Sequence, residues 1–297
     1  METLNTAFGK YIKDAMKLSK SSSHITEENV YQEGADDILP YLDKMVEYVI
    51  LPGSGIEGIE NLDDLYSKAE SGKSCLLLLE HYSNMDLSMI SYLLRNSGER
   101  GKKIGNSIVA IAGMKLNEDN PGVAALTSAY TRLVIYPSRS LQHLDPEKDR
   151  AEIVRSNSIN RAAMKTLIRI KNKGRLILMF PSGTRYRPWD PSTKKGVREI
   201  DSFIRTFDYM CLVALNGQVL HVNQGDMLDD VVTKDVVRLS VSPVISCTEF
   251  RNKARGEDSP STGQEQEDKK QAVADAIMEE LERMHIEGEE KRKKLLP

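Results

Sequence analysis

Two short polar segments carry the residue types that acid–base chemistry and phosphate binding need. In the first, His81 and Asp86 lie between an apolar run, residues 75–79, and an amphipathic stretch, residues 87–94. A tight turn between a strand and a helix would bring the carboxylate to one ring nitrogen. Neutral imidazole has one donor and one acceptor nitrogen, so a carboxylate that takes the donor leaves the other nitrogen free as a base. A lone His near an Asp is usually structural, but this placement favours catalysis.

The second segment has the composition of a phosphate-binding loop. It follows the apolar run 174–180 and reads FPSGTRYRP over residues 180–188. The proline ends strand pairing because it has no N–H to donate, and Gly183 can take backbone angles closed to other residues. Arg185 and Arg187 follow, and guanidinium groups pair with phosphate oxygens two at a time. The competing interpretation is a surface turn with solvated arginines.

Further cationic residues follow other predicted strands. Lys115 comes after the apolar run 107–112, and Arg139 comes after the run 133–136. In open α/β sheets, ligands bind beyond the carboxyl ends of the strands. A solvated surface explains any one of these charges, but it explains their common placement poorly. We therefore expect Lys115, Arg139 and the two arginines of the second segment to form a shared anion site near His81.

Together, the two segments resemble the glycerolipid acyltransferase superfamily. That superfamily carries a His-x4-Asp block and a Phe-Pro-Glu-Gly-Thr-Arg-like block, and Ser182 stands here in place of the usual Glu. Within it, the chain is most similar to the soluble plastid-type glycerol-3-phosphate acyltransferases, whose second block continues as Arg-x-Arg-Pro and then Pro-Ser-Thr. The sequence IYPSRS over residues 135–140 parallels their Val-Tyr-Ser-Lys-Lys-His segment. The likeness covers residues 31–246.

The resemblance implies acyl transfer without a covalent enzyme intermediate. His81 would act as general base on a hydroxyl of glycerol 3-phosphate, and Asp86 would orient it and stabilise the imidazolium. The hydroxyl would attack a thioester of acyl-carrier protein or coenzyme A, which is a co-substrate. We expect no further cofactor and no metal.

The same resemblance assigns the substrate-binding residues. Arg139, Arg185 and Arg187, with Lys115 as a weaker candidate, would hold the phosphate and so position the hydroxyl. Backbone donors near Gly183 and Thr184 are candidates for stabilising the oxyanion.

Three departures from the plastid pattern leave the acceptor open. Ser140 stands where those enzymes have a phosphate-binding His, Arg139 replaces a Lys, and the pair Met114-Lys115 differs from their Asp-Arg pair. The alternative acceptor is 1-acylglycerol 3-phosphate (lysophosphatidic acid) or another lysolipid, although Ser182 in place of Glu argues against that branch.

Two hypotheses come from outside this activity. The first is a catalytically inactive relative that binds phosphate or lipid, against which the intact His81 and Asp86 argue. The second is a serine hydrolase with Ser83 or Ser182 as nucleophile, but no Gly-x-Ser-x-Gly elbow is present.

The elements that must position these residues alternate along the chain. Apolar runs predict strands at 75–79, 107–112, 133–136, 174–180, 210–215 and 237–244, and periodic patterns predict helices at 62–71, 87–94, 120–131 and 145–173. This alternation predicts an α/β fold with a mostly parallel, mixed sheet flanked by helices. We also expect a helix start at 26–29 and a polar loop at 101–105.

The chain divides into three predicted regions. Residues 1–52 read as a small N-terminal helical domain or cap, and 53–250 as the α/β acyltransferase domain. Residues 251–297 read as a polar loop, a helix over 270–286 and a basic tail. The tail has two interpretations, a frayed terminus or a contact with anionic lipid at a membrane surface.

Composition restricts the class of protein. Hydrophobic residues at 40% and charged residues at 29% fit a soluble globular protein, and a net charge of −3 argues against nucleic-acid binding. The three cysteines form no close pair, which is typical of a reducing compartment. No apolar stretch approaches the roughly 18–20 residues that cross a bilayer, and no signal peptide is recognisable. We therefore expect a cytoplasmic protein, with peripheral membrane contact through the tail as a further expectation.

Overall fold

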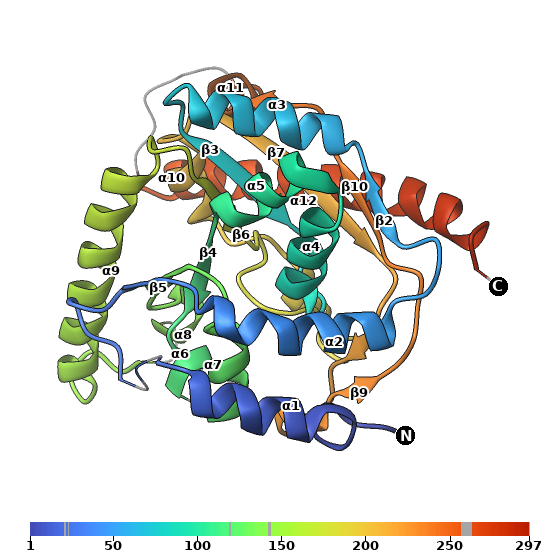
Figure 1. Ribbon diagram of the computed structural model, residues 1–297. Helices are drawn as coiled ribbons and strands as arrows, with labels where there is room; N and C mark the ends of the chain where they lie inside the picture. The colour runs from blue at the N-terminus through green and yellow to red at the C-terminus, as the bar shows by residue number, and fades with distance from the viewer. Residues whose placement is uncertain (21, 23, 119, 142–143, 257–262, 297) are drawn as a thin grey trace.

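The computed structural model describes residues 1–297 except 21, 23, 119, 142–143, 257–262 and 297, and it omits the side chains of residues 115 and 117. Within the described residues, the chain folds around a nine-stranded mixed sheet with the order β1-β5-β4-β6-β3-β7-β10-β2, and β11 also pairs with β7 (Figure 1). Helices flank this sheet. The predicted α/β fold with a mostly parallel mixed sheet is therefore confirmed.

The centre of the sheet is parallel. Its strands, in spatial order, are β5 (Arg132–Ile135), β4 (Ile108–Gly113), β6 (Leu176–Met179), β3 (Cys75–Leu79) and β7 (Tyr209–Asn216). Strands covered on both faces read as continuous apolar runs, and β3 and β6 are buried at every position. All five run the same way, so their carboxyl ends meet at one edge of the sheet.

Shorter strands complete the sheet on both sides. β1 (Tyr31–Gln32) pairs antiparallel with β5. β10 (Arg238–Val241) and β11 (Ile245–Ser246) pair antiparallel with β7, and β2 (Gly55–Glu57) pairs parallel with β10. A separate two-stranded sheet joins β8 (Leu220–His221) to β9 (Val231–Val232).

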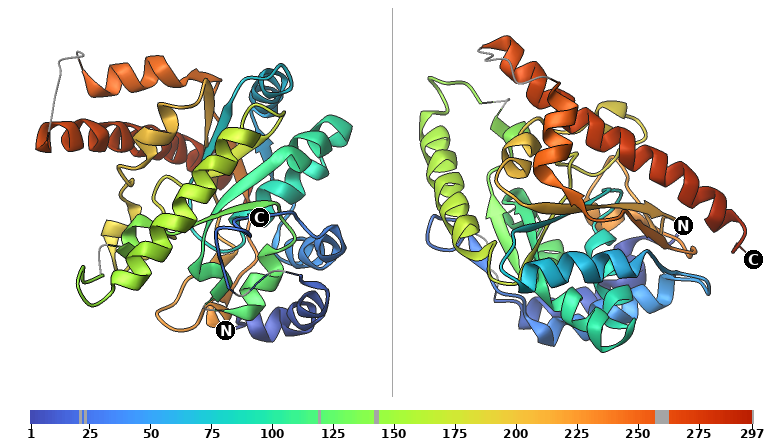
Figure 2. Two further views of the ribbon diagram at one scale, coloured as in Figure 1. Left: turned by 90° about the vertical axis from the view of Figure 1, so that its left-hand side faces the viewer. Right: turned by 90° about the horizontal axis from the view of Figure 1, so that it is seen from above.

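Helices cover both faces of the central sheet. On one face lie α3 (Ile59–Glu70), α4 (Asp86–Arg95) and α5 (Gly98–Ser107), and on the other lie α9 (Arg150–Ile170), α10 (Ile200–Ile204), α11 (Cys247–Arg255) and α12 (Gln264–Lys293). The right-hand view of Figure 2 shows α12 running the length of one side of the sheet, with α3 on the opposite side. Each layer buries its own hydrophobic cluster against alternate residues of the strands.

A third hydrophobic cluster lies beside the sheet. It joins α1 (Leu4–Leu18), α2 (Leu39–Val49) and α7 (Pro121–Thr127) to Met89 of α4 and to Met85, the residue before that helix. The shortest helices are α6 (Lys115–Glu118), α8 (Ser138–Leu141), η1 (Asp36–Ile38), η2 (Pro191–Lys194) and η3 (Met227–Asp229). Within the described ranges, no helix is both long and apolar enough to traverse a membrane.

The polar segment 101–105, predicted to be a loop, is instead the centre of α5. Gly101 permits close packing rather than a turn, since a Cβ on this residue would collide with the carbonyl oxygen of Leu94. Ile104 is buried and anchors the helix in the cluster beneath it. A glycine that allows two helices to approach has the same local signature as a glycine in a loop.

The helix starts predicted at 26–29 and 145 are also wrong. At the first, the Asn29 side chain accepts a hydrogen bond from the Thr26 N–H at 2.8 Å and closes a turn before β1. At the second, the Asp145 carboxylate accepts from the N–H groups of Glu147 and Lys148, so a separate turn precedes α9. In both cases the polar side chain accepts hydrogen bonds from backbone N–H groups of a turn, and it does not cap the start of a helix.

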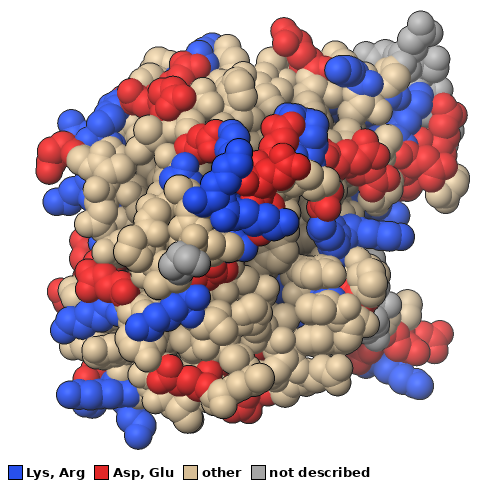
Figure 3. All heavy atoms as spheres, turned by 90° about the vertical axis from the view of Figure 1, so that its right-hand side faces the viewer, with Lys and Arg blue, Asp and Glu red and all other residues tan. Residues whose placement is uncertain are grey.

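The C-terminal region differs from its prediction at both ends. Residues 251–255, predicted to be loop, belong to α11, while 257–262 fall outside the described residues. In the basic tail, Lys291 pairs with Glu57, and Arg292 pairs with Asp235. Figure 3 shows acidic side chains interspersed among basic ones on this side of the molecule, so the face does not present a single sign of charge.

Candidate active site

The structure brings His81 and Asp86 together at the carboxyl end of β3. The Nδ1 atom of His81 lies 2.9 Å from Oδ2 of Asp86. An ionised carboxylate only accepts hydrogen bonds, so Nδ1 carries the proton and Nε2 keeps its lone pair. Among the described residues, Nε2 has no hydrogen-bond partner. This arrangement leaves a base directed away from the carboxylate.

Asp86 is held by the turn that precedes it. It is the first residue of α4, and its side chain is 4% exposed. Oδ2 accepts hydrogen bonds from the backbone N–H groups of Tyr82 (2.6 Å) and Ser83 (2.9 Å), and Oδ1 accepts from the Ser83 hydroxyl at 2.8 Å. A carboxylate at a helix N-terminus also interacts favourably with the helix dipole. The carboxylate that orients His81 is therefore itself fixed, and the Ser83 hydroxyl is used in fixing it.

The second polar segment lies directly against the first. The rings of His81 and Phe180 are stacked, and the carbonyl oxygen of His81 accepts a hydrogen bond from the Tyr186 N–H at 2.8 Å. Because β3 and β6 are adjacent parallel strands, the residues that follow them emerge side by side. The two segments, far apart in the sequence, form one structure.

Residues 180–184 make a tight turn stabilised by its own hydrogen bonds. The Gly183 N–H donates to the carbonyl oxygen of Phe180 at 2.9 Å, and Gly183 has a φ of +66°, which side-chain-bearing residues rarely adopt. The Ser182 hydroxyl donates to the carbonyl oxygen of Thr184 at 2.7 Å. The Gly183 N–H is thus already hydrogen-bonded within the turn. Gly183 allows the turn to form because it can adopt this positive φ.

Arg185 forms a buried ion pair. One of its Nη atoms lies 2.6 Å from Oδ2 of Asp230, whose side chain is 1% exposed. Burial raises the pKa of Asp230 although the charge of Arg185 and a hydrogen bond from the Asn223 N–H act to lower it. Nothing in the local sequence links the loop before β9 to residue 185, so this partner could not be predicted.

Arg187 and Arg139 lie around a common neighbour, Asp190. The Asp190 pKa is lowered first by its hydrogen bond to the Ser192 hydroxyl, and the charges of Arg187 and Arg139 add to this effect. Arg139 also donates to the backbone carbonyl of Lys195 at 3.2 Å. Within the described part of the chain, the exposed guanidinium of Arg187 makes no hydrogen bond. The structure thus places these two cations near Asp190, whereas Arg185 pairs with Asp230.

The remaining cation predicted for this site is Lys115. Its backbone begins α6, directly after β4, but its side chain falls outside the described residues. Its relation to the arginines therefore stays a prediction. Among the residues that the structure describes, no group of three or more His, Cys, Asp or Glu side chains is placed to hold a metal ion.

A buried polar network next to His81 was not anticipated from the sequence. Glu80 is 5% exposed; its carboxylate accepts hydrogen bonds from the Tyr82 hydroxyl at 2.9 Å and the Leu215 N–H at 2.8 Å, and it lies 2.9 Å from Nδ1 of His285. An acidic residue directly after a buried strand was the one available signal. His285 lies on α12 and has no local signal at all.

The charges of this network shift two pKa values. Burial and the nearby Glu80 carboxylate raise the pKa of Tyr82, so it stays a neutral hydroxyl donor. Burial acts to lower the pKa of His285, but the hydrogen bond to Glu80 and the charges of Glu80 and Glu282 outweigh it, and the net shift is upward. A protonated imidazole is thereby favoured beside the Glu80 carboxylate.

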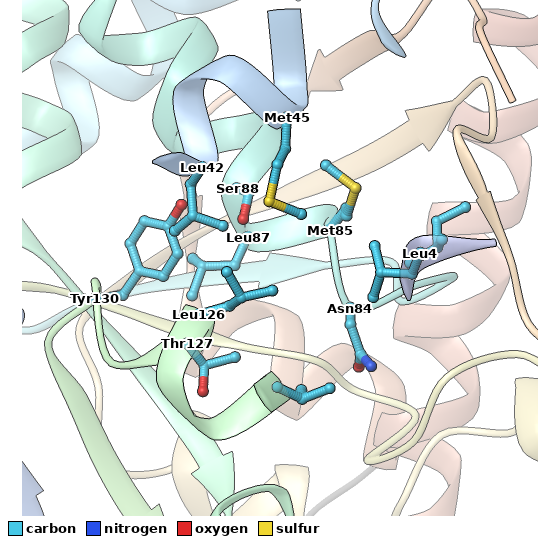
Figure 4. Close-up of a pocket in the computed structure, with 12 residues that line it drawn as sticks. Leu4, Leu42, Met45, Asn84, Met85, Leu87, Ser88, Leu126, Thr127 and Tyr130 are labelled. Atoms are coloured by element: carbon cyan, nitrogen blue, oxygen red, sulfur yellow. The ribbon is translucent and has the colours of Figure 1, made fainter. Parts of the chain in front are cut away.

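An apolar crevice begins at the turn that carries Asp86. It has a volume of about 30 Å³, and side chains from α1, α2, α4 and α7 line it, including Met45, Met85, Leu126 and Tyr130. Figure 4 shows these side chains facing one another around the start of α4, with Asn84 at one side. The volume is sufficient for about two water molecules, and methionine side chains adapt readily to a longer occupant.

Residues 55–225, more than half of the chain, match the family model described as Acyltransferase. The matched range includes both polar segments and ends before Asp230 and before α12. No match to a curated protein was found.

Proposed function

The chain belongs to the acyltransferase family, and we propose that it moves a fatty acyl group from a thioester carrier to a hydroxyl of glycerol 3-phosphate. Membership of the family implies an enzyme that transfers acyl groups, while the acceptor and the plastid-type branch are part of the proposal. The observation that carries it is the contact between the His81–Asp86 pair and the segment 180–187, through the Phe180 ring and the Tyr186 N–H.

In the proposed reaction, His81 is the general base. Its Nε2 takes the proton from the acceptor hydroxyl as the oxygen attacks the thioester carbonyl, and Asp86 stabilises the imidazolium that forms. The new C–O bond replaces the C–S bond, and the proton passes from His81 to the departing thiolate. No covalent enzyme intermediate is needed. The carrier is acyl-carrier protein or coenzyme A, and no other cofactor enters the proposal.

We assign the acceptor phosphate to Arg187 and Arg139. Arg187 belongs to the segment that contacts His81 and is exposed, and Arg139 lies near the same carboxylate, Asp190. Bidentate pairing with guanidinium groups would fix the phosphate and so orient the hydroxyl towards Nε2. Arg185 contributes mainly by holding the loop to Asp230, and Lys115 and Thr184 remain candidates from the sequence alone.

We place the acyl chain at the apolar crevice, which would have to widen by movement of the methionine side chains that line it. It adjoins Asn84 and Met85, within the turn between His81 and Asp86, and its walls are mostly aliphatic. Burying hydrocarbon in such a crevice is favourable by about 0.8 kcal/mol per CH₂ group. An acyl chain held there would bring its thioester carbonyl close to the turn.

One observation favours a lysolipid as the second candidate acceptor. Trp189 is 43% exposed and follows Arg187 by two positions. Tryptophan beside a cation is typical of residues that meet lipid headgroups at a membrane surface. A lysolipid acceptor would place its phosphate at Arg187 and its chain in the bilayer next to Trp189.

The experiment that tests the proposal presents purified protein with acyl-carrier-protein and coenzyme A thioesters and a panel of acceptors, and identifies the products by mass. The His81→Ala variant is the control for non-enzymatic transfer. We expect a higher kcat/KM for glycerol 3-phosphate than for lysophosphatidic acid in mixed micelles. A clear preference for the lysolipid would select the second candidate, and no transfer to any acceptor would contradict both.

A further inference from the structure

We infer that His285, on the long C-terminal helix α12, is a positioning residue for the catalytic turn, and that it acts through Glu80 and Tyr82. The inference rests on the proposed function, because it requires His81 to be the base. α12 lies beyond residues 55–225, so His285 is outside the part of the chain that matches the family model.

Glu80 is the centre of the argument. It is the residue before His81, and its side chain is 4% exposed. A buried carboxylate is costly unless hydrogen bonds and a positive charge compensate it. Here the Tyr82 hydroxyl binds Oε1, whereas the Leu215 N–H and Nδ1 of His285 lie at Oε2. His285 supplies the positive charge closest to Glu80 among the ion pairs of the described residues.

Tyr82 connects this carboxylate to the catalytic pair. Its hydroxyl is bonded to Glu80 and lies 3.3 Å from Nδ1 of His285, while its own backbone N–H holds Oδ2 of Asp86 at 2.6 Å. Its ring also meets the Tyr186 ring edge-on, with centroids 6.1 Å apart. Since the Tyr186 N–H binds the His81 carbonyl, the position of the Tyr82 ring bears on both sides of the catalytic turn.

The surroundings of His285 are otherwise adapted to hold it in place. Its backbone carbonyl accepts a hydrogen bond at 2.9 Å from Asn216, which is fully buried at the end of β7. The charges of Glu80, Glu282 and Lys194 act on the pKa of His285, and His285 in turn acts to lower the pKa of Glu289. None of the hydrogen bonds of His285 reaches His81 or Asp86, so its effect on the reaction has to pass through Glu80 and Tyr82.

Loss of the His285 ring leaves Glu80 buried with less compensation. The carboxylate then keeps only the hydrogen bonds from the Tyr82 hydroxyl and the Leu215 N–H. It has to accept a further hydrogen bond from water or from another donor to make up for the loss. Either response moves Tyr82, and with it the N–H that holds Asp86. The expected defect is in the chemical step and not in substrate binding, because neither substrate is proposed to contact α12.

The test compares His285→Ala, His285→Gln and Tyr82→Phe with wild type in steady-state kinetics for both substrates. His285→Ala should lower kcat about tenfold, the size expected from loss of one hydrogen bond to a charged group, with both KM values within about twofold of wild type. His285→Gln keeps an N–H donor and should stay within about threefold of wild-type kcat. The double variant with Tyr82→Phe should lose no more than the worse single variant, since the two residues act as one unit.

Met284→Ala is the matched control. Met284 is the neighbouring residue on α12 and lies in the hydrophobic cluster against the sheet. It should lower the melting temperature without the fall in kcat. Two results would overturn the inference: equal losses of kcat in Met284→Ala and His285→Ala, or an unchanged kcat in His285→Ala. The proposed function would still stand in either case if wild type is active and His81→Ala is inactive. A wild-type protein that transfers no acyl group would instead overturn the proposed function and the inference with it.

Discussion

The imidazole ring of His81 lies face to face with the phenyl ring of Phe180, with ring centroids 3.8 Å apart and ring planes inclined by 16°. The stack fixes the plane of the imidazole, and the hydrogen bond from Nδ1 to Asp86 fixes its rotation within that plane. Together, these two contacts set the direction of Nε2. The base proposed for the reaction is therefore oriented by one residue from each polar segment.

His81→Ala should abolish nearly all acyl transfer, because no other group at this turn can take the proton. A loss of about 10²- to 10⁴-fold in kcat is typical for removal of a general base. Asp86→Asn should lose less but remain severely impaired. Single-turnover kinetics measures both effects, with circular dichroism as the check on folding. Near-normal turnover by His81→Ala would rule out the proposed chemistry.

Phe180→Leu keeps an apolar side chain but removes the stacked ring. Aromatic pairs contribute about 0.5–1.5 kcal/mol beyond their buried area, so kcat should fall by about two- to tenfold. The KM for the acceptor should change little, because Phe180 is assigned no contact with phosphate. Phe180→Tyr is the matched control, since it restores the ring. A Leu variant as active as the Tyr variant would mean that the stack has no part in catalysis.

Arg185→Ala and Arg187→Ala should have different effects. Removing Arg185 leaves Asp230 buried without its partner, which costs about 3 kcal/mol of unfolding free energy, while Arg187→Ala should leave stability unchanged. Arg187→Ala should instead raise the acceptor KM roughly ten- to a hundredfold, with little change in the thioester KM. Urea denaturation and steady-state kinetics measure the two effects.

The control for this pair of variants adds Asp230→Asn to Arg185→Ala. The neutral amide removes the uncompensated charge and should recover most of the lost stability. If Arg185→Ala is as stable as wild type, the ion pair has no structural role. If Arg187→Ala weakens only the thioester, this arginine serves the donor and the phosphate assignment is wrong.

The His285–Glu80 pair makes stability depend on pH. The pKa of His285 is raised in the folded protein, so the folded state holds the proton more tightly than the unfolded chain does. The stabilisation is complete below the unfolded pKa of about 6.5 and is lost as pH rises through the folded value. The advantage of wild type over His285→Gln in urea denaturation should therefore shrink as pH increases above about 6.5. An advantage that grows with pH would contradict the upward shift.

Leu126→Phe should narrow the apolar crevice beside the catalytic turn. Long-chain thioesters should then lose kcat/KM relative to short-chain thioesters, because the added ring takes volume from the crevice walls. Leu126→Met, which nearly conserves volume, is the matched control. Parallel changes for short and long chains in both variants would show that the acyl chain binds elsewhere.

The strands and the turn at His81 could be predicted because their signals are local. Buried parallel strands are apolar at every position, as in β3, and the hydrogen bond between His81 and Asp86 spans one turn of chain. Helix α5 was not predicted because Gly101 packs closely against Leu94, and a local sequence pattern does not show which residues pack together. The fold class depends on the alternation of elements and tolerates such an error.

Contacts between distant segments could not be predicted from the sequence. Arg185 looked free to bind phosphate because Asp230 reaches it only through the path of the chain before β9. His285 approaches Glu80 because α12 packs along β7, which no spacing of residues encodes. The sequence thus supplied the chemical groups near the base, whereas the tertiary structure decides which of them are already paired.

Both edges of the main sheet come from the beginning of the chain. Strand β1 closes one edge against β5, and β2 closes the other against β10, so residues up to Glu57 flank strands that continue to Val241. During synthesis on the ribosome, the edge strands β1 and β2 emerge before β5 and β10, the strands with which they pair. Until β10 is complete, the nascent sheet exposes unpaired N–H and C=O groups, the feature that promotes aggregation of β-proteins. Pairing of β2 with β10 thus joins one of the first strands made to one of the last.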